Sequence, residues 1–100
     1  METLALMKAA ALHDRGLRRD FVDVHAICKS PGWSVERFID LATTRLPLAP
    51  VQMKLALSYY ADADQRADGL NYGVPWERVK ADLQRGVQEW ERNRNRGLDR

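Results

Sequence analysis

The stretch that decides the fold reads Arg18-Arg19-Asp20-Phe21-Val22-Asp23-Val24-His25-Ala26-Ile27-Cys28-Lys29. Its apolar side chains recur every three or four residues, which is the period of one face of an α-helix. Asp20 and Asp23 are three residues apart, so they are neighbours on the surface of such a helix. The stretch therefore predicts an amphipathic helix that also carries a paired-acid face.

The same spacing continues on both sides of this stretch, and no strand-like alternation persists long enough to build a sheet. The apolar residues that define the further helices are Leu4, Met7, Ala11, Leu12, Val35, Phe38, Ile39, Ala42, Leu46, Met53, Ala56, Leu57, Tyr60, Trp76, Val79, Leu83, Val87 and Trp90. We therefore predict an all-α fold, a compact bundle of about five helices.

Particular residues predict where the helices begin, end and approach one another. Thr3 and Ser34 are suited to cap helix N-termini, and Pro50 is suited to a first helical turn. Gly16 is a plausible stop signal, and Gly86 is expected to permit close contact between helices. The segment from residue 62 to residue 73 is rich in Asp and Gly, which predicts a loop with at most a helical turn.

Length and composition favour one small globular domain. The chain has 100 residues and a net charge of +2, so a protein that coats nucleic acid is not indicated. Its single cysteine, Cys28, cannot form an internal disulfide and fits a reducing compartment. No basic leader and no apolar run of membrane-spanning length are present, so we expect a cytoplasmic protein. The predicted organisation is a helical domain over residues 1–91 and a basic, solvated tail over residues 92–100.

A lone lysine, Lys8, lies in an otherwise uncharged run one helix before the paired acids. Two interpretations follow from the residues. In the first, an anionic ligand binds between the two helices. In the second, Lys8 and Arg19 form ion pairs with Asp20 and Asp23 that connect the helices.

Other groups of polar residues are less specific. His25 and Cys28 share a helix face, but two ligands do not make a zinc site and nothing specifies His13 as a third, so no metal is predicted. The loop acids lack the Gly and Glu of a calcium loop and are expected to cap helices and solvate the loop. These acids are Asp62, Asp64 and Asp68. A further interpretation is RNA binding through the tail and through Arg15, Arg18 and Arg19.

Three segments together resemble a known family. The first spans residues 6–25 and contains Lys8, Arg15-Gly16 and Arg19-Asp20-Phe21-Val22-Asp23. The second reads Ser58-Tyr59-Tyr60-Ala61-Asp62-Ala63-Asp64, and the third reads Pro75-Trp76-Glu77-Arg78-Val79-Lys80. In this order they resemble the C-terminal helical part of the AbiEii-type nucleotidyltransferases, the toxins of a class of bacterial toxin–antitoxin and phage-defence systems. The likeness extends over about residues 4–90.

The resemblance implies roles for several residues in a complete protein. Asp20 and Lys8 are implied to be catalytic, and Lys8 and Arg19 are implied to bind the nucleotide. Arg15, Arg19, Asp20 and Asp23 are the candidates for structural ion pairs. A complete family member also implies Mg²⁺ and a nucleoside triphosphate, whereas no cofactor is expected in this chain.

The family's metal-binding core, with its Gly-Gly motif and acid pair, has no counterpart in this sequence. We therefore expect the chain to be inactive by itself. Its expected partners are a separate N-terminal catalytic half or an antitoxin protein. The alternative is a stand-alone helical protein–protein interaction module, as a homodimer through an exposed apolar face.

Overall fold

A computed structural model describes residues 1–65 and 72–98 of the chain. In these residues the backbone forms six helices and no strand, which confirms the all-α prediction. The helices are α1 (Glu2–Asp14), α2 (Arg18–Lys29), α3 (Val35–Arg45), α4 (Pro50–Ser58), α5 (Ala61–Gln65) and α6 (Trp76–Leu98).

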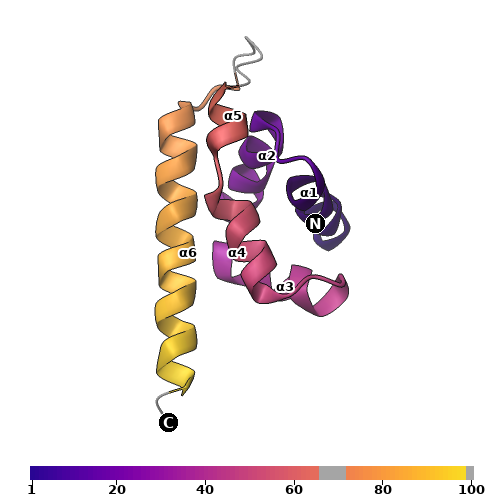
Figure 1. Ribbon diagram of the computed structural model, residues 1–100, viewed down its shortest axis with the longest axis vertical. Coiled ribbons are helices and arrows are strands. Elements are labelled where there is room, and N and C mark those ends of the chain that lie inside the picture. Colours follow the sequence, from indigo (N-terminus) through magenta and orange to yellow (C-terminus); the bar gives the residue numbers. More distant parts are fainter. Residues whose placement is uncertain (66–71, 99–100) are drawn as a thin grey trace.

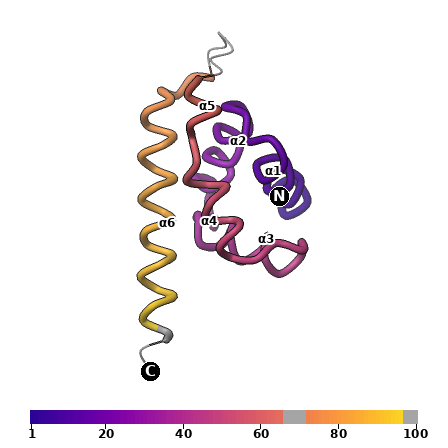
Figure 2. Tube along the Cα trace, viewed as in Figure 1, coloured from indigo at the N-terminus to yellow at the C-terminus, as the bar shows by residue number. Residues whose placement is uncertain are grey.

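The long helix α6 runs along one side of the bundle, and the shorter helices gather on its other side (Figure 1). Helix α6 packs against α2, α3 and α4. Helix α1 packs against the same three helices from the opposite side of the bundle. The N-terminus therefore lies on the side of the bundle away from α6, as the trace in Figure 2 shows. Helix α2 contacts both α1 and α6 and connects the two sides.

The core forms where the apolar faces of these helices meet. Burying a side chain of this size stabilises the fold by about 1.5–3 kcal/mol. The largest side chains that are almost fully buried are Phe21, Phe38, Ile39, Met53, Leu57 and Leu83. The predicted faces of α2, α3 and α6 therefore do supply the core, as the spacing of their apolar residues indicated.

Helix α1 turns a different face to the core from the one that its sequence predicted. Leu4 and Met7 are 45% and 63% exposed, whereas Ala5 and Ala9 are buried together with Leu12. Residues 4–12 are apolar around nearly the whole helix, so their spacing cannot select the buried face. The small alanine side chains let α1 approach its neighbours closely, and the larger side chains remain outside.

The predicted helix starts are correct in two cases and wrong in one. The Ser34 hydroxyl accepts a hydrogen bond of 3.0 Å from the Arg37 N–H at the start of α3, and Pro50 is the first residue of α4. Thr3 does not cap α1, because the helix has already begun at Glu2 and the Met1 carbonyl accepts the Ala5 N–H.

Gly86 brings α6 close to the start of α3. A Cβ at this position would collide with the side chain of Val35, so only glycine fits without a shift. The predicted close contact at Gly86 is confirmed.

The segment predicted as a loop begins with α5, and its residues 66–71, Asp68 among them, lie outside the described residues. At the other end of α6, the basic stretch after residue 91 continues the helix to Leu98. Its side chains from Arg92 to Arg96 are exposed. The helix therefore extends into the segment that was expected to be a tail.

Candidate functional site

The Lys8–Asp23 pair connects α1 to α2. Lys8 Nζ lies 2.8 Å from Asp23 Oδ2, and the two side chains are 26% and 46% exposed. The pair sits in a shallow hollow of about 410 Å³ whose other lining residues include Met1, Leu4 and Ile27. A charged pair in an apolar, open setting of this kind is accessible to a ligand or to a second protein surface.

Both carboxylate oxygens of Asp20 accept hydrogen bonds. Its oxygens accept hydrogen bonds from Arg15 Nε (3.0 Å) and Arg15 Nη2 (2.9 Å), and Oδ2 also accepts the Leu17 N–H at 3.0 Å. Asp20 itself is 0% exposed. The hydrogen bond to Asp20 raises the pKa of the Arg15 guanidinium. The arrangement is a bidentate, charge-assisted ion pair, which is one of the stronger polar contacts in proteins.

The local sequence explains how Arg15 reaches Asp20. Gly16 has a φ of +57°, a left-handed conformation that glycine adopts at little cost, and it turns the chain between α1 and α2. Asp20 lies in the first turn of α2, where a carboxylate satisfies free N–H groups and is stabilised by the helix dipole. Arg15, Gly16 and Asp20 therefore form one structural unit that joins the two helices.

The remaining arginines of the motif differ in their surroundings. Arg18 donates hydrogen bonds of 3.1 Å to the carbonyl oxygens of Ala63 and Asp64, and its guanidinium lies 4.9 Å from the Trp76 ring centre. It is therefore occupied in joining α2 to α5 and α6. Arg19 is exposed and pairs with neither Asp20 nor Asp23.

The structure thus brings Lys8 to Asp23 and Arg15 to Asp20, and it leaves Arg19 on the surface beside them. Arg19 and Asp23 are four residues apart on α2 and so share a face of that helix. On this face the Lys8 ammonium is paired with Asp23, whereas Arg19 has no carboxylate partner among the described residues. The catalytic and nucleotide-binding roles implied for Lys8, Arg19 and Asp20 remain predictions.

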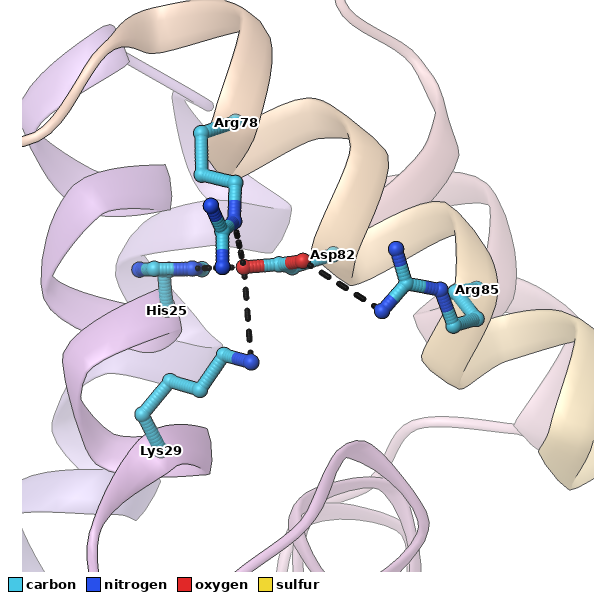
Figure 3. A network of polar contacts seen from close by, with 5 residues as sticks. All are labelled: His25, Lys29, Arg78, Asp82 and Arg85. Carbon is cyan, nitrogen blue, oxygen red and sulfur yellow. Dashed lines mark hydrogen bonds and ion pairs between the residues drawn. The ribbon is translucent and has the colours of Figure 1, made fainter.

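A second cluster of charged residues lies between α2 and α6 and is centred on Asp82 (Figure 3). Asp82 Oδ2 lies 2.8 Å from His25 Nε2, 3.2 Å from Arg78 Nε and 3.4 Å from Lys29 Nζ. On the other side of the carboxylate, Arg85 Nη1 lies 3.6 Å from Oδ1. Both His25 and Asp82 are buried, at 9% and 8% exposure.

The surrounding donors set the charge state of Asp82. The hydrogen bond from His25 is the main cause that lowers its pKa to about 2, with further contributions from Arg78 and Lys29, although burial opposes the shift. Asp82 is therefore ionised at neutral pH. Its Oδ1 atom is buried and accepts no hydrogen bond from a described residue.

Sequence reasoning missed this cluster because it grouped His25 with Cys28, its neighbour on the same helix. The sequence signal for this cluster was Asp82, an acid that lies between Val79 and Leu83 on the predicted apolar face of the last helix. A buried acid needs a partner from another helix, and the polar residue on the apolar face of α2 is His25.

Burial raises the pKa of the Cys28 thiol to about 12, so the thiol form predominates at neutral pH. In residues 1–65 and 72–98, no group of three or more His, Cys, Asp or Glu side chains is placed to hold a metal ion. Asp64, which was expected in a loop, lies in α5 and accepts hydrogen bonds from Trp76 Nε1 at 2.6 Å and from Lys80 Nζ at 3.0 Å, so it connects α5 to α6.

No protein-family model, curated protein or solved structure matches the chain. None of the helices in the described part of the chain is both long enough and apolar enough to span a membrane.

Proposed function

We propose that the chain is the C-terminal helical part of an AbiEii-like nucleotidyltransferase of the toxin–antitoxin or phage-defence type, acting in the cytoplasm. In this proposal it supplies the face that carries Lys8 and Arg19, and a separate catalytic domain supplies the metal-binding acids. Mg²⁺ and a nucleoside triphosphate would bind in the completed site. The chain by itself is inactive.

The observation that carries the proposal is the setting of Lys8. Its ammonium group is partly exposed and pairs with a half-exposed carboxylate, so a phosphate that approaches from solvent can compete with Asp23 for it. Met1 and Leu4, which line the same hollow, and the adjacent Met7 are 56%, 45% and 63% exposed. Large apolar side chains beside a cation fit a surface that another domain covers.

Asp20 has a supporting role in this proposal. Because its two oxygens are bound by Arg15 and by the Leu17 N–H, it holds the α1–α2 corner together and thereby positions Lys8. This assignment differs from the catalytic role that the resemblance implies for Asp20, because a carboxylate that acts as a general base needs a free oxygen within reach of the hydroxyl that it deprotonates.

The proposal is tested first by reading the genomic DNA in frame upstream of the Met1 codon. A Gly-Gly motif followed by an acid pair is the expected result, and upstream sequence without them would remove the composite site. The protein in which the upstream catalytic domain is joined to this chain is then assayed with labelled nucleoside triphosphates, Mg²⁺ and cellular RNA. Lys8→Ala is expected to lower transfer by at least about a hundredfold, because it removes a cation from the developing phosphate charge.

Lys54→Ala is the matched control. Lys54 also pairs with an acid, Glu91, and is partly exposed, so both substitutions break one ion pair near the surface of small energetic value. Equal activity of the two variants would count against a role for Lys8 in the reaction.

A second candidate is a stand-alone interaction module that forms a homodimer through α4. Val51 and Leu55 on α4 and Tyr59 at its C-terminal cap recur every four residues and are 59%, 60% and 62% exposed. Leu55 and Tyr59 also line a cleft of about 460 Å³ between the end of α1 and α4. Light scattering over a range of concentrations tests the idea. Leu55→Gln is expected to abolish a dimer that Met7→Gln retains, and a strict monomer would exclude it.

A further inference from the structure

Lys29 and Arg85 approach Asp82 from two sides, but neither forms a hydrogen bond with it (Figure 3). Their charged atoms lie 3.4 Å and 3.6 Å from its oxygens. No hydrogen bond joins either side chain to another residue of the described ranges, 1–65 and 72–98. Both therefore keep N–H donors for a further acceptor.

The cluster contains more positive charge than Asp82 needs. His25 and Arg78 already donate hydrogen bonds to Oδ2. With Lys29 and Arg85 added, three permanent cations surround one carboxylate. Glu89, which lines the same region, offsets one of them. The remaining excess is positive and lies at the surface, since the Lys29 and Arg85 side chains are 54% and 64% exposed.

These two cations line a cleft of about 260 Å³ between α2, α3 and α6. The cleft also contains Trp33, Ser34 and Val35 at the N-terminus of α3. Ser34 Oγ accepts the Arg37 N–H, so its hydroxyl hydrogen is available as a donor. The partial positive charge of the helix N-terminus adds to that of the two side chains.

We propose that Lys29 and Arg85 bind a phosphate group in this cleft, with the Ser34 hydroxyl as an additional donor. Two cationic donors on opposite walls can each form a charge-assisted hydrogen bond to a phosphate oxygen. The cleft of about 260 Å³ has room for more than one phosphate group. The Arg37 guanidinium lies 4.1 Å from the centre of the Trp33 ring, and the rest of the Trp33 side chain, which lines the cleft, offers an apolar contact for the remainder of a phosphate-bearing molecule.

The phosphate can come from a free nucleotide-like compound or from an RNA backbone. Arg92 and Arg96 follow Arg85 on α6 at seven and eleven residues, so they lie close to the same side of the helix. A chain of phosphates would meet Arg92 about 10 Å beyond Arg85. A single phosphate would engage only the cleft.

This site is distinct from the Lys8 face and does not rest on the proposed function. Helix α2 turns Asp23 toward α1 and His25 toward α6, so the two clusters lie on different flanks of the same helix. Loss of one site by substitution is therefore expected to leave the other intact.

The test is a titration of the ¹⁵N-labelled full chain, followed by NMR, with inorganic phosphate, tripolyphosphate and a short single-stranded oligouridine. Sodium chloride at equal ionic strength is the blank. The expected result is a saturable shift of the Trp33 indole and Ser34 amide signals. Arg85→Ala and Lys29→Ala are each expected to weaken binding by roughly tenfold or more, because each removes a charged hydrogen bond. Arg45→Ala and Lys54→Ala, which change the charge equally on other helices, should leave binding unchanged.

The probes separate the sources of the phosphate. Binding of phosphate and tripolyphosphate with this dependence on the variants assigns a small phosphate compound. Binding of the oligouridine alone, weakening steeply with salt and further on Arg92→Ala, assigns an RNA backbone. No saturable shift with any probe, or equal affinities for Arg85→Ala and Arg45→Ala proteins that remain folded, would overturn the proposal.

Discussion

His25 on α2 and Asp82 on α6 meet through a contact of 2.8 Å between Nε2 and Oδ2, although 57 residues separate them in the chain. Both side chains are buried, and their contact offsets the free-energy cost of removing each of them from water. The contact fixes the position of α6 relative to α2. It also gathers Lys29, Arg78 and Arg85 around one carboxylate, so a structural pair creates the surface to which we assign phosphate binding.

Acidification is expected to remove the contribution of Asp82 to stability. Its pKa is about 2 in the folded protein and has the ordinary value of 3.8 when the chain is unfolded. The contribution is therefore fully present above about pH 4 and is lost as the pH falls through about 2. Urea unfolding of the wild type and Asp82→Asn should show a difference in stability at pH 7 that shrinks between pH 4 and pH 2. A constant difference over this range would contradict the assigned pKa.

The two acids of the opening motif are expected to differ in their importance for folding. Asp20→Asn weakens a bidentate pair in which the carboxylate is buried and the Arg15 side chain is 46% exposed, and it should lower the free energy of unfolding by about 2 kcal/mol. Asp23→Asn breaks a pair that is partly exposed and should change it by less than about 1 kcal/mol. Chemical unfolding of both variants measures the difference directly. Equal losses would mean that burial does not separate the two acids.

Much of the fold could be predicted from the sequence because periodicity reports on packing wherever a helix has one polar and one apolar face. Helix α3 is such a case, with Val35, Phe38, Ile39 and Ala42 all buried as expected. In α1 the apolar residues extend around the helix, so their spacing could not predict which face of the helix is buried. For this reason the prediction that Met7 lies in the core was wrong.

The candidate site was harder to predict because ion pairing between helices depends on their packing. The sequence left open whether Lys8 binds a ligand or pairs with an acid, and the structure places it beside Asp23. Arg15 and Arg19 were both candidates for pairing with the acids, and Arg15 takes Asp20 because the Gly16 turn directs it back toward α2. The Asp82 cluster joins residues from α2 and α6, and no local pattern links elements so far apart.

Alkylation of Cys28 is expected to be very slow in the folded protein. Burial raises its pKa to about 12, so only about one thiol in ten thousand is ionised at pH 8, and the thiolate is the reactive form. Iodoacetamide labelling at pH 8, followed by mass spectrometry, should be at least about a hundredfold faster in 8 M urea than in buffer. Similar rates in both conditions would show that the thiol is not protected.

The close approach of α6 to α3 predicts that Gly86→Ala destabilises the fold. In an exposed helix this change would stabilise by up to about 1 kcal/mol, because alanine is the better helix former. Here the new methyl group would collide with Val35, and overpacking of this kind costs about 1–3 kcal/mol, so the net effect should be a loss. Combining it with Val35→Ala removes the opposing methyl groups but keeps the Cβ of residue 35, which also lies within collision distance, so the clash is relieved in part. The double variant should therefore be more stable than the sum of the single effects predicts. Urea unfolding of the four proteins gives this coupling energy. Strict additivity would show that the Gly86–Val35 contact is not what restricts this position.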